Sequence, residues 1–157
     1  MLYTLAALIG PEGTRMSIEQ DKETVRRFII DVWESPSGAA LMPEIIAEDF
    51  VDHAPWGDIS DGIEEQQRQH GLFHAAFDIE TTLHHVIAEG DLVCDHWTAT
   101  VTHKGEFAGI PATGRTFTVN AIDLHRMRDG KISESWHQED FPLHLAELRA
   151  AAAAATP

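Results

Sequence analysis

The chain has 157 residues, of which 43% are hydrophobic, so it has the size of one domain with room for a core. Its 26 acidic residues outnumber 11 Lys and Arg, which gives a formal net charge of −15. This charge repels nucleic acid and anionic membrane surfaces, and it favours a small neutral ligand as the partner. The single cysteine, Cys94, excludes an internal disulfide, and we expect it to be a buried, inert thiol.

The first sixteen residues are predicted to be an N-terminal extension that need not be ordered. Residues 2–10 are apolar, but no Lys or Arg precedes them, and they are far too short to span a bilayer. They lack the charged leader and the small-residue cleavage site of an export signal. We therefore expect a cytoplasmic protein that contacts no membrane.

The first half of the domain is predicted to be helical. Ser17 and Gln20 form a capping-box pattern, and apolar residues then recur at helical spacing until residues 35–38 stop the helix. A second short helix is expected around residues 41–46, running into the segment DFVDHAPWG. A third helix should begin near residue 61, where Asp61 and Glu64 resemble a cap, and continue towards residue 77.

The second half changes to the period and composition of β-strands. Residues 79–88, 91–103, 116–128 and 131–140 are rich in Thr, Val and Ile, and turn residues separate them. Pro142 begins a helical tail that should fray after Arg149, which leaves an Ala-rich end at residues 149–157. Helices followed by a meander of strands predict one α+β domain over residues 17–148, with helices covering one face of a curved sheet.

The last hairpin places many polar side chains on one face. With Asp129 and Gly130 as the two turn residues, His125 faces Glu134 and Asp123 faces Trp136. In this register the inner face holds Asp123, His125, Glu134, Trp136, Gln138 and Asp140, and the outer face holds Ser133, Ser135 and His137. A bulge at the turn would shift the register by one residue. Buried charges are costly unless they are paired or used, so the inner cluster is a candidate site.

Several segments resemble the SnoaL-like polyketide cyclases of the nuclear transport factor 2-like superfamily. These segments are VRRFIIDVW, EDFVDHAPWG, IAEGDLV, HWTATVTHKGEFAGIPATG and IDLHRMRDGKISESWHQED, in an order and spacing that cover residues 17 to about 148. The resemblance implies a cone of bent sheet and three helices around a deep apolar pocket. It also implies intramolecular aldol ring closure, without metal or organic cofactor, on a small hydrophobic substrate.

The resemblance assigns roles to three residues. Asp140, four residues beyond Trp136, takes the place of the general base, His125 on the preceding strand would assist, and His53 would lie at the pocket wall or rim. A carboxylate beside Trp136 in an apolar pocket should have a raised pKa, as a carbon base needs. The enolate that forms needs a hydrogen-bond donor, which His125, His53 or the neutral Gln138 could supply.

Other readings of these residues remain open. Asp140 could cap the tail helix, and His125 with Glu134 could be a structural cross-strand pair. Trp97 and Trp136 could belong to the core while lining the pocket, Trp56 is a candidate lid, and the loop GEFAGIPATG, which contains Phe107, should cover the pocket mouth. Asp123, Glu134 and Gln138 complete the expected substrate-binding set.

Two function classes follow from these patterns. The first is a cofactor-independent enzyme that acts on a hydrophobic carbonyl compound as a cyclase or a related isomerase or dehydratase. The second is a non-catalytic binding or assembly module on the same fold, which would need fewer polar groups in its pocket. We expect no metal, because His70 and His74 have zinc-site spacing but no third ligand follows. The outer sheet face, with Ile122 and Leu124, predicts a homodimer or a higher homo-oligomer.

Overall fold

The computed structural model describes residues 17–53 and 61–155. Its helical elements are α1 (Ile18–Arg27), the π-helix η1 (Phe28–Trp33), the 3-10 helix η2 (Gly38–Leu41), α2 (Met42–Ile45), α3 (Ile63–Ala76) and α4 (Phe141–Ala155). Its strands are β1 (Ile46–Asp52), β2 (Phe77–Glu89), β3 (Leu92–His103), β4 (Thr116–Arg128) and β5 (Lys131–Glu139). The predicted α+β class is confirmed. None of the helices in the described ranges could span a bilayer.

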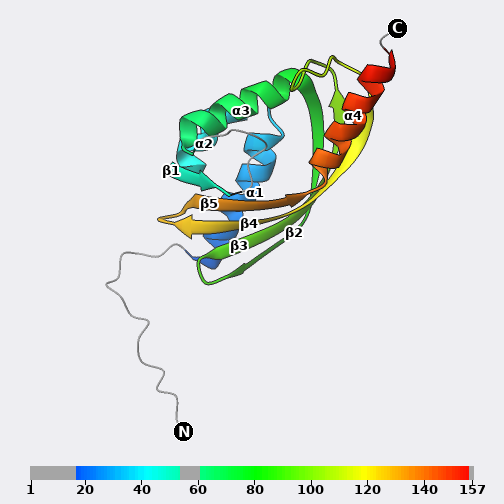
Figure 1. Ribbon diagram of the computed structural model, residues 1–157. Coiled ribbons are helices and arrows are strands. Elements are labelled where there is room, and N and C mark those ends of the chain that lie inside the picture. Colours follow the sequence, from blue (N-terminus) through cyan, green and yellow to red (C-terminus); the bar gives the residue numbers. More distant parts are fainter. Residues whose placement is uncertain (1–16, 54–60, 156–157) are drawn as a thin grey trace, which may run out of the picture.

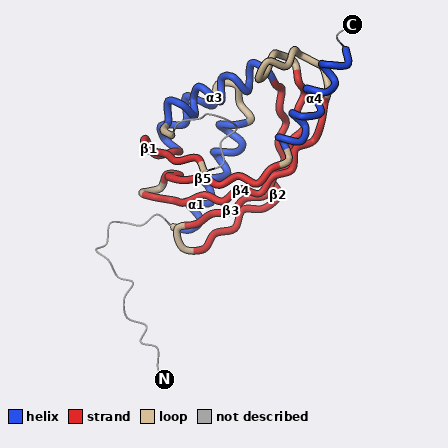
Figure 2. Tube along the Cα trace, viewed as in Figure 1, coloured by secondary structure: helices blue, strands red, loops and turns tan. Residues whose placement is uncertain are grey.

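The strands form one mixed sheet in the order β1-β5-β4-β3-β2. β1 runs parallel to β5, and the other neighbouring strands are antiparallel. Figure 1 shows the long strands bending around α1, with α3 across the open side and α4 far from β1. In Figure 2 the strands trace one continuous curved layer, and α1 and α3 lie on its concave side. The concave face is therefore the covered one.

The first helix forms as its sequence predicts. The side chain of Ser17 accepts a hydrogen bond from the backbone N–H of Gln20, whose own side chain accepts from the backbone of Ser17. Acidic residues lie in the first turn and basic residues in the last, which complements the helix dipole. The buried face includes Val25 and continues through η1 with Phe28 and Val32, so α1 and η1 present one apolar stripe to the sheet.

Alternation along the strands divides the sheet into two faces. On β4, Val119, Ala121, Asp123 and His125 are buried, and the residues between them are exposed or partly exposed. The buried apolar side chains form two clusters, one around α1, η1 and β1 and one around Phe73, Phe77 and Phe141. Trp33 and Trp97 pack against both clusters. These two indoles therefore stand where the clusters meet.

Three expectations about the elements are wrong in detail. The expected second helix is present as α2 but ends at Ile45, and residues 46–52 form the strand β1, which was not predicted, because Ile46 and residues 51–52 pair with β5. Asp61 does not cap α3; Gly62 is its N-cap residue, and Asp61 Oδ1 accepts from the backbone N–H of Asp52 at 3.3 Å. α4 continues through the Ala-rich end to Ala155, because Ala is the strongest helix former.

The last hairpin turns at the predicted residues but has a different register. Asp129 and Gly130 have φ of 53° and 78°, and Arg128 and Met127 pair with Lys131 and Ile132 as expected. A β-bulge then follows, because Ser133 is an extra residue on β5. Its Oγ donates to the carbonyl of Arg126 at 3.1 Å.

The bulge reverses the faces of β5. Arg126 pairs with Glu134, His125 with Ser135 and Asp123 with His137. The expectation that Trp136 points inward while Ser133, Ser135 and His137 point outward is therefore wrong. Ser135 is buried and His137 lines the interior, whereas Trp136 pairs with the exposed Leu124. A shift of one residue exchanges every side chain between the two faces.

Candidate active site

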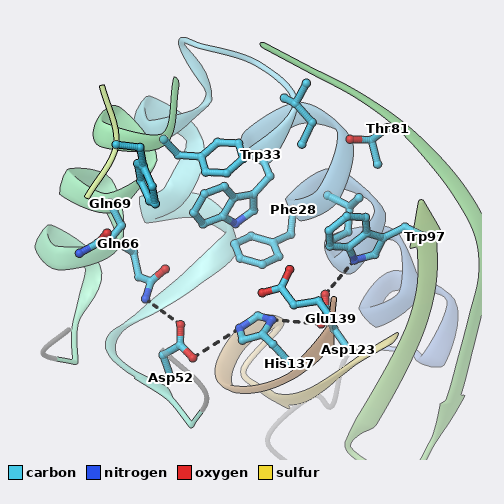
Figure 3. A pocket seen from close by; sticks show the side chains of 14 residues that line it. Phe28, Trp33, Asp52, Gln66, Gln69, Thr81, Trp97, Asp123, His137 and Glu139 are labelled. Carbon is cyan, nitrogen blue, oxygen red and sulfur yellow. Dashed lines mark hydrogen bonds and ion pairs between the residues drawn. The ribbon is translucent and has the colours of Figure 1, made fainter. Parts of the chain in front are cut away.

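A largely apolar pocket lies between the helices and the concave face of the sheet. It contains about 890 Å³ of empty space, a volume that includes the open solvent at its mouth. The lining residues are Phe28, Ile29, Trp33, Asp52, Gln66, Gln69, Phe73, Ile79, Thr81, Trp97, Phe107, Asp123, His137 and Glu139. Figure 3 shows the aromatic side chains gathered on one side and the carboxylates and His137 on the other.

The polar end of the pocket is a histidine between two carboxylates. His137 Nδ1 lies 3.1 Å from Asp123 Oδ1, and His137 Nε2 lies 3.4 Å from Asp52 Oδ1 (Figure 3). Asp52 is at the end of β1, Asp123 is in the middle of β4, and His137 is on β5. Three adjacent strands therefore build this cluster, which the bulge in β5 completes.

Both carboxylates are oriented by a further donor. Trp97 Nε1 donates to Asp123 Oδ2 at 2.8 Å, and Gln66 Nε2 donates to Asp52 Oδ2 at 3.3 Å. The Asp123 side chain is only 3% exposed, so its position is fixed by these contacts rather than by solvent. The imidazole is in turn held in one orientation by Asp123. A carboxylate bonded to one ring nitrogen fixes the direction of an imidazole ring in this way.

The two carboxylates also control the charge of His137. Burial by itself lowers the pKa of this imidazole, but hydrogen bonds and opposite charges from Asp123 and Asp52 outweigh burial and raise the pKa to about 10. His137 is therefore an imidazolium at neutral pH. In this state it can donate a proton or a hydrogen bond, and it cannot act as a base.

A second polar cluster lies deeper in the core. His125 Nδ1 lies 2.6 Å from Ser135 Oγ, and His125 Nε2 lies 3.1 Å from Asp95 Oδ1. The side chains of His125 and Asp95 are both 0% exposed. Burial raises the pKa of Asp95, although the hydrogen bond from His125 opposes this. Among the described residues, Asp95 Oδ2 has no hydrogen-bond partner. Asp95, Asp123 and His125 each place one potential metal-ligand atom within 4.8 Å of the others.

Only part of the predicted site lines the pocket. Asp123, Trp97 and Phe107 do so. His125 is fully buried behind it and does not appear in the lining. Trp56 lies outside the described residues.

Three other predicted residues gather on the outer side of the sheet. His53 stacks on Trp136 with ring centroids 4.5 Å apart, and its Nε2 lies 2.9 Å from Glu134 Oε2. The guanidinium of Arg126 lies over the Trp136 ring at 5.7 Å and contacts Glu134 as well. The inward placement of Glu134 and Trp136 was predicted from the unshifted register, and the bulge makes that prediction wrong. His53 was expected at the pocket wall or rim from the family resemblance, but it does not line the pocket.

Asp140 and Gln138 also lie away from the pocket lining. Asp140 Oδ1 and Oδ2 accept hydrogen bonds from the backbone N–H and the Nδ2 of Asn120, at 2.8 Å and 2.7 Å. Partial burial raises the pKa of this carboxyl, but the Asn120 bonds outweigh it and lower the pKa, so the expected increase is wrong. Gln138 is exposed and donates to the carbonyl of His137. The catalytic role of Asp140 stays a prediction.

The polar side of the pocket includes four residues that were not predicted as site residues from the sequence: Asp52, Gln66, His137 and Glu139. Asp52 belongs to the DFVDH segment, where only the neighbouring His53 drew attention. His137 and Glu139 lie on the face of β5 that the unshifted register assigned to the outside. Allowing for a bulge would have found both, because they alternate with Trp136 along the strand.

An α+β cone with an acid/base cluster at one end of an apolar pocket defines a small-molecule enzyme or binding fold of the nuclear transport factor 2-like type. Residues 23–148 match the SnoaL-like polyketide cyclase family, and the chain belongs to that family. No curated protein sequence matches the chain.

Solved structures agree with this assignment. IdmH from Streptomyces antibioticus, a proposed polyketide cyclase, is 31% identical with a TM-score of 0.65, and the match covers 82% of this chain and 98% of that one. A proposed polyketide cyclase from Acidithiobacillus ferrooxidans is 25% identical with a TM-score of 0.72, over 87% and 99% of the two chains. TsrD from Streptomyces laurentii, at 21% identity, shares the fold with a TM-score of 0.75 over 85% and 98%.

Proposed function

We propose that this protein is a cofactor-independent enzyme that closes a ring in a hydrophobic carbonyl compound by intramolecular aldol addition. The observation behind this proposal is the position of His137, held between Asp52 and Asp123 at the polar end of an apolar pocket. Apolar walls bind the carbon skeleton, and the charged end meets the carbonyl oxygen. Membership of a cyclase family supports the same reaction class.

His137 supplies the hydrogen bond to the developing oxyanion. Its Nδ1–H donates to Asp123, while the longer contact of 3.4 Å to Asp52 leaves the Nε2–H weakly held. A substrate carbonyl oxygen that accepts from Nε2–H becomes an enolate oxygen as the neighbouring carbon loses a proton. Because the donor is charged and already oriented, it stabilises the enolate more than the ground-state carbonyl.

Glu139 is the general base in this proposal. It lies two residues after His137 on the same face of β5, and Figure 3 shows its carboxylate directed towards the middle of the pocket near Phe28. The carboxylate takes the proton from carbon, and the enolate carbon bonds to a second carbonyl carbon of the same substrate. The alkoxide formed there takes the proton back from Glu139, so the reaction needs no further reactant.

The proposal is tested by proton exchange at carbon, which does not require the natural substrate. Wild-type protein in deuterated buffer should accelerate the exchange of the acidic C–H protons of a bicyclic 1,3-diketone, followed by NMR. Glu139→Gln should reduce this rate roughly a hundredfold or more, and Asp140→Asn should leave most of it. If Asp140→Asn instead lost the exchange activity while Glu139→Gln retained it, the general base would be Asp140.

Absence of any acceleration, together with saturable binding of the diketone, would instead support the second function class, a non-catalytic small-molecule binder. Cytoplasmic location and self-association complete the proposal. Both concern where and in what form the enzyme acts, and neither affects the proton-exchange test.

A further inference from the structure

Three histidines meet on the outer face of the sheet, away from the pocket. β2 contains a register shift between residues 83 and 85, where Leu83 pairs with Trp97 and His85 pairs with His96. His84 is the extra residue, and such a bulge turns two successive side chains of one strand towards the same face. His84 and His85 are accordingly both exposed, and both contact side chains on the outer face of β3.

The distances within this group suit a metal ion. Nδ1 of His85 lies 3.2 Å from Nδ1 of His96, and the two rings are parallel to within 4°. Zinc bound to imidazole nitrogens at about 2.0–2.1 Å in a tetrahedral site separates two such nitrogens by about 3.4 Å. The pair therefore already has the spacing of two ligands on one ion.

A third imidazole stands beside this pair. The ring centroid of His84 lies 4.8 Å from that of His96, and its Nε2 contacts Thr98 Oγ1 at 2.9 Å. Because His84 is exposed, rotation about its side-chain bonds can bring a ring nitrogen to the same ion without moving the backbone. A net charge of −15 further favours the approach of a cation.

We propose that His84, His85 and His96 form a binding site for a divalent transition-metal ion of the zinc and copper class. The site is independent of the proposed reaction, since it lies on the opposite face of the sheet from the pocket. This proposal differs from the expectation of no metal, which rested on the spacing of His70 and His74. Those two are engaged in the core, where their Nε2 atoms contact the carbonyls of Val32 and Trp33 at 2.8 Å and 3.0 Å.

The experiment is a calorimetric titration of tag-free, metal-stripped full-length protein with ZnCl₂, repeated with CuCl₂. Wild-type protein should bind roughly one equivalent per chain, and His85→Ala and His96→Ala should each weaken binding roughly tenfold or more. Cys94→Ser is the matched control, because it removes a nearby thiol that could also bind a metal ion on the same face of the sheet. This variant should bind zinc as tightly as wild type does. Bound zinc should also raise the melting temperature of wild type but not of His96→Ala.

Two results would overturn the proposal. One is the lack of stoichiometric binding of either ion. The other is binding that persists in His96→Ala but is lost in a folded Asp95→Asn variant, which would place the ion at the buried group of Asp95, Asp123 and His125 instead. Circular dichroism of each variant separates loss of binding from loss of folding. Copper bound to imidazoles should also show nitrogen hyperfine splitting in its electron paramagnetic resonance spectrum.

Discussion

Replacing Asp123 by Asn should lower the pKa of His137 and change how stability depends on pH. Asn keeps the shape and can still accept from Trp97 Nε1, which now donates to Asp123 Oδ2 at 2.8 Å. It removes the negative charge that lies 3.1 Å from His137 Nδ1. Of the two carboxylates, Asp123 also makes the shorter contact, so the larger part of the upward shift should disappear with it.

The size of the effect follows from the shift itself. Raising the pKa of His137 from 6.5 to about 10 corresponds to about 5 kcal/mol of preference for the folded state when the imidazole is charged. This figure is an upper limit, because the side chain is 20% exposed and water screens the charges. The stabilisation is fully present below pH 6.5 and is lost as pH rises through 10. Wild-type protein should therefore lose stability between pH 7 and pH 10, and Asp123→Asn should lose less.

The assay is an NMR titration of the His137 imidazole, supported by urea unfolding at several pH values. The variant Asp78→Asn removes a surface carboxylate that pairs with Lys104, and it should leave the His137 titration unchanged. The difference in unfolding free energy between wild type and Asp123→Asn should shrink as pH rises, because wild type loses more of the stabilisation that comes from His137. Tyr and Lys titrations are common to both proteins and cancel in this difference. A wild-type His137 that titrates near 6.5 would refute the reasoning.

Further outcomes are expected from single substitutions and from hydrodynamics. In urea unfolding, Gly38→Ala should cost several kcal/mol of stability, because a Cβ there would lie 2.1 Å from a backbone carbonyl oxygen of η1. Gly71→Ala on α3 should instead stabilise the protein by up to about 1 kcal/mol, because a Cβ there would have no neighbouring atom within 4 Å. Phe28→Ala, at a side chain only 2% exposed, should cost about 3–5 kcal/mol and enlarge the pocket. Ile122 and Leu124, 54% and 36% exposed on the outer face, should be covered in a homodimer, and sedimentation at micromolar concentration showing only a 17.4 kDa species would contradict this.

The fold was largely predictable because its signals are local. The four long strands were predicted to within about two residues at each end, because runs of Thr and Val bounded by turn residues strongly indicate β-strands. The capping box at Ser17 fixed the start of α1 for the same reason. β1 was missed because it pairs in parallel with β5, more than eighty residues away, and nothing local marks so distant a partner.

The site was less predictable because it depends on one irregular residue. The Asp-Gly turn was correct, but the bulge at Ser133 has no sequence signal of the kind that a glycine or proline provides. Every side chain beyond it was therefore placed on the wrong face, and Trp136 and His137 exchanged roles. Asp123 was placed correctly because β4 lies before the bulge. The pairing of Asp52 with His137 required the position of β1, which was not predicted.

The bulge in β5 also determines which changes in chain length the protein can tolerate. Side chains along a strand alternate between the two faces of the sheet, and the extra residue at position 133 decides which face each later side chain of β5 points to. Deleting one residue there would turn His137 and Glu139 outward and bring Trp136 into the pocket, although none of these three side chains would itself be changed. Substitutions in the turn should be harmless by comparison. In alignments of the SnoaL-like family, a single-residue gap between the turn and the last strand should therefore mark a change in the polar lining of the pocket rather than a neutral difference in loop length.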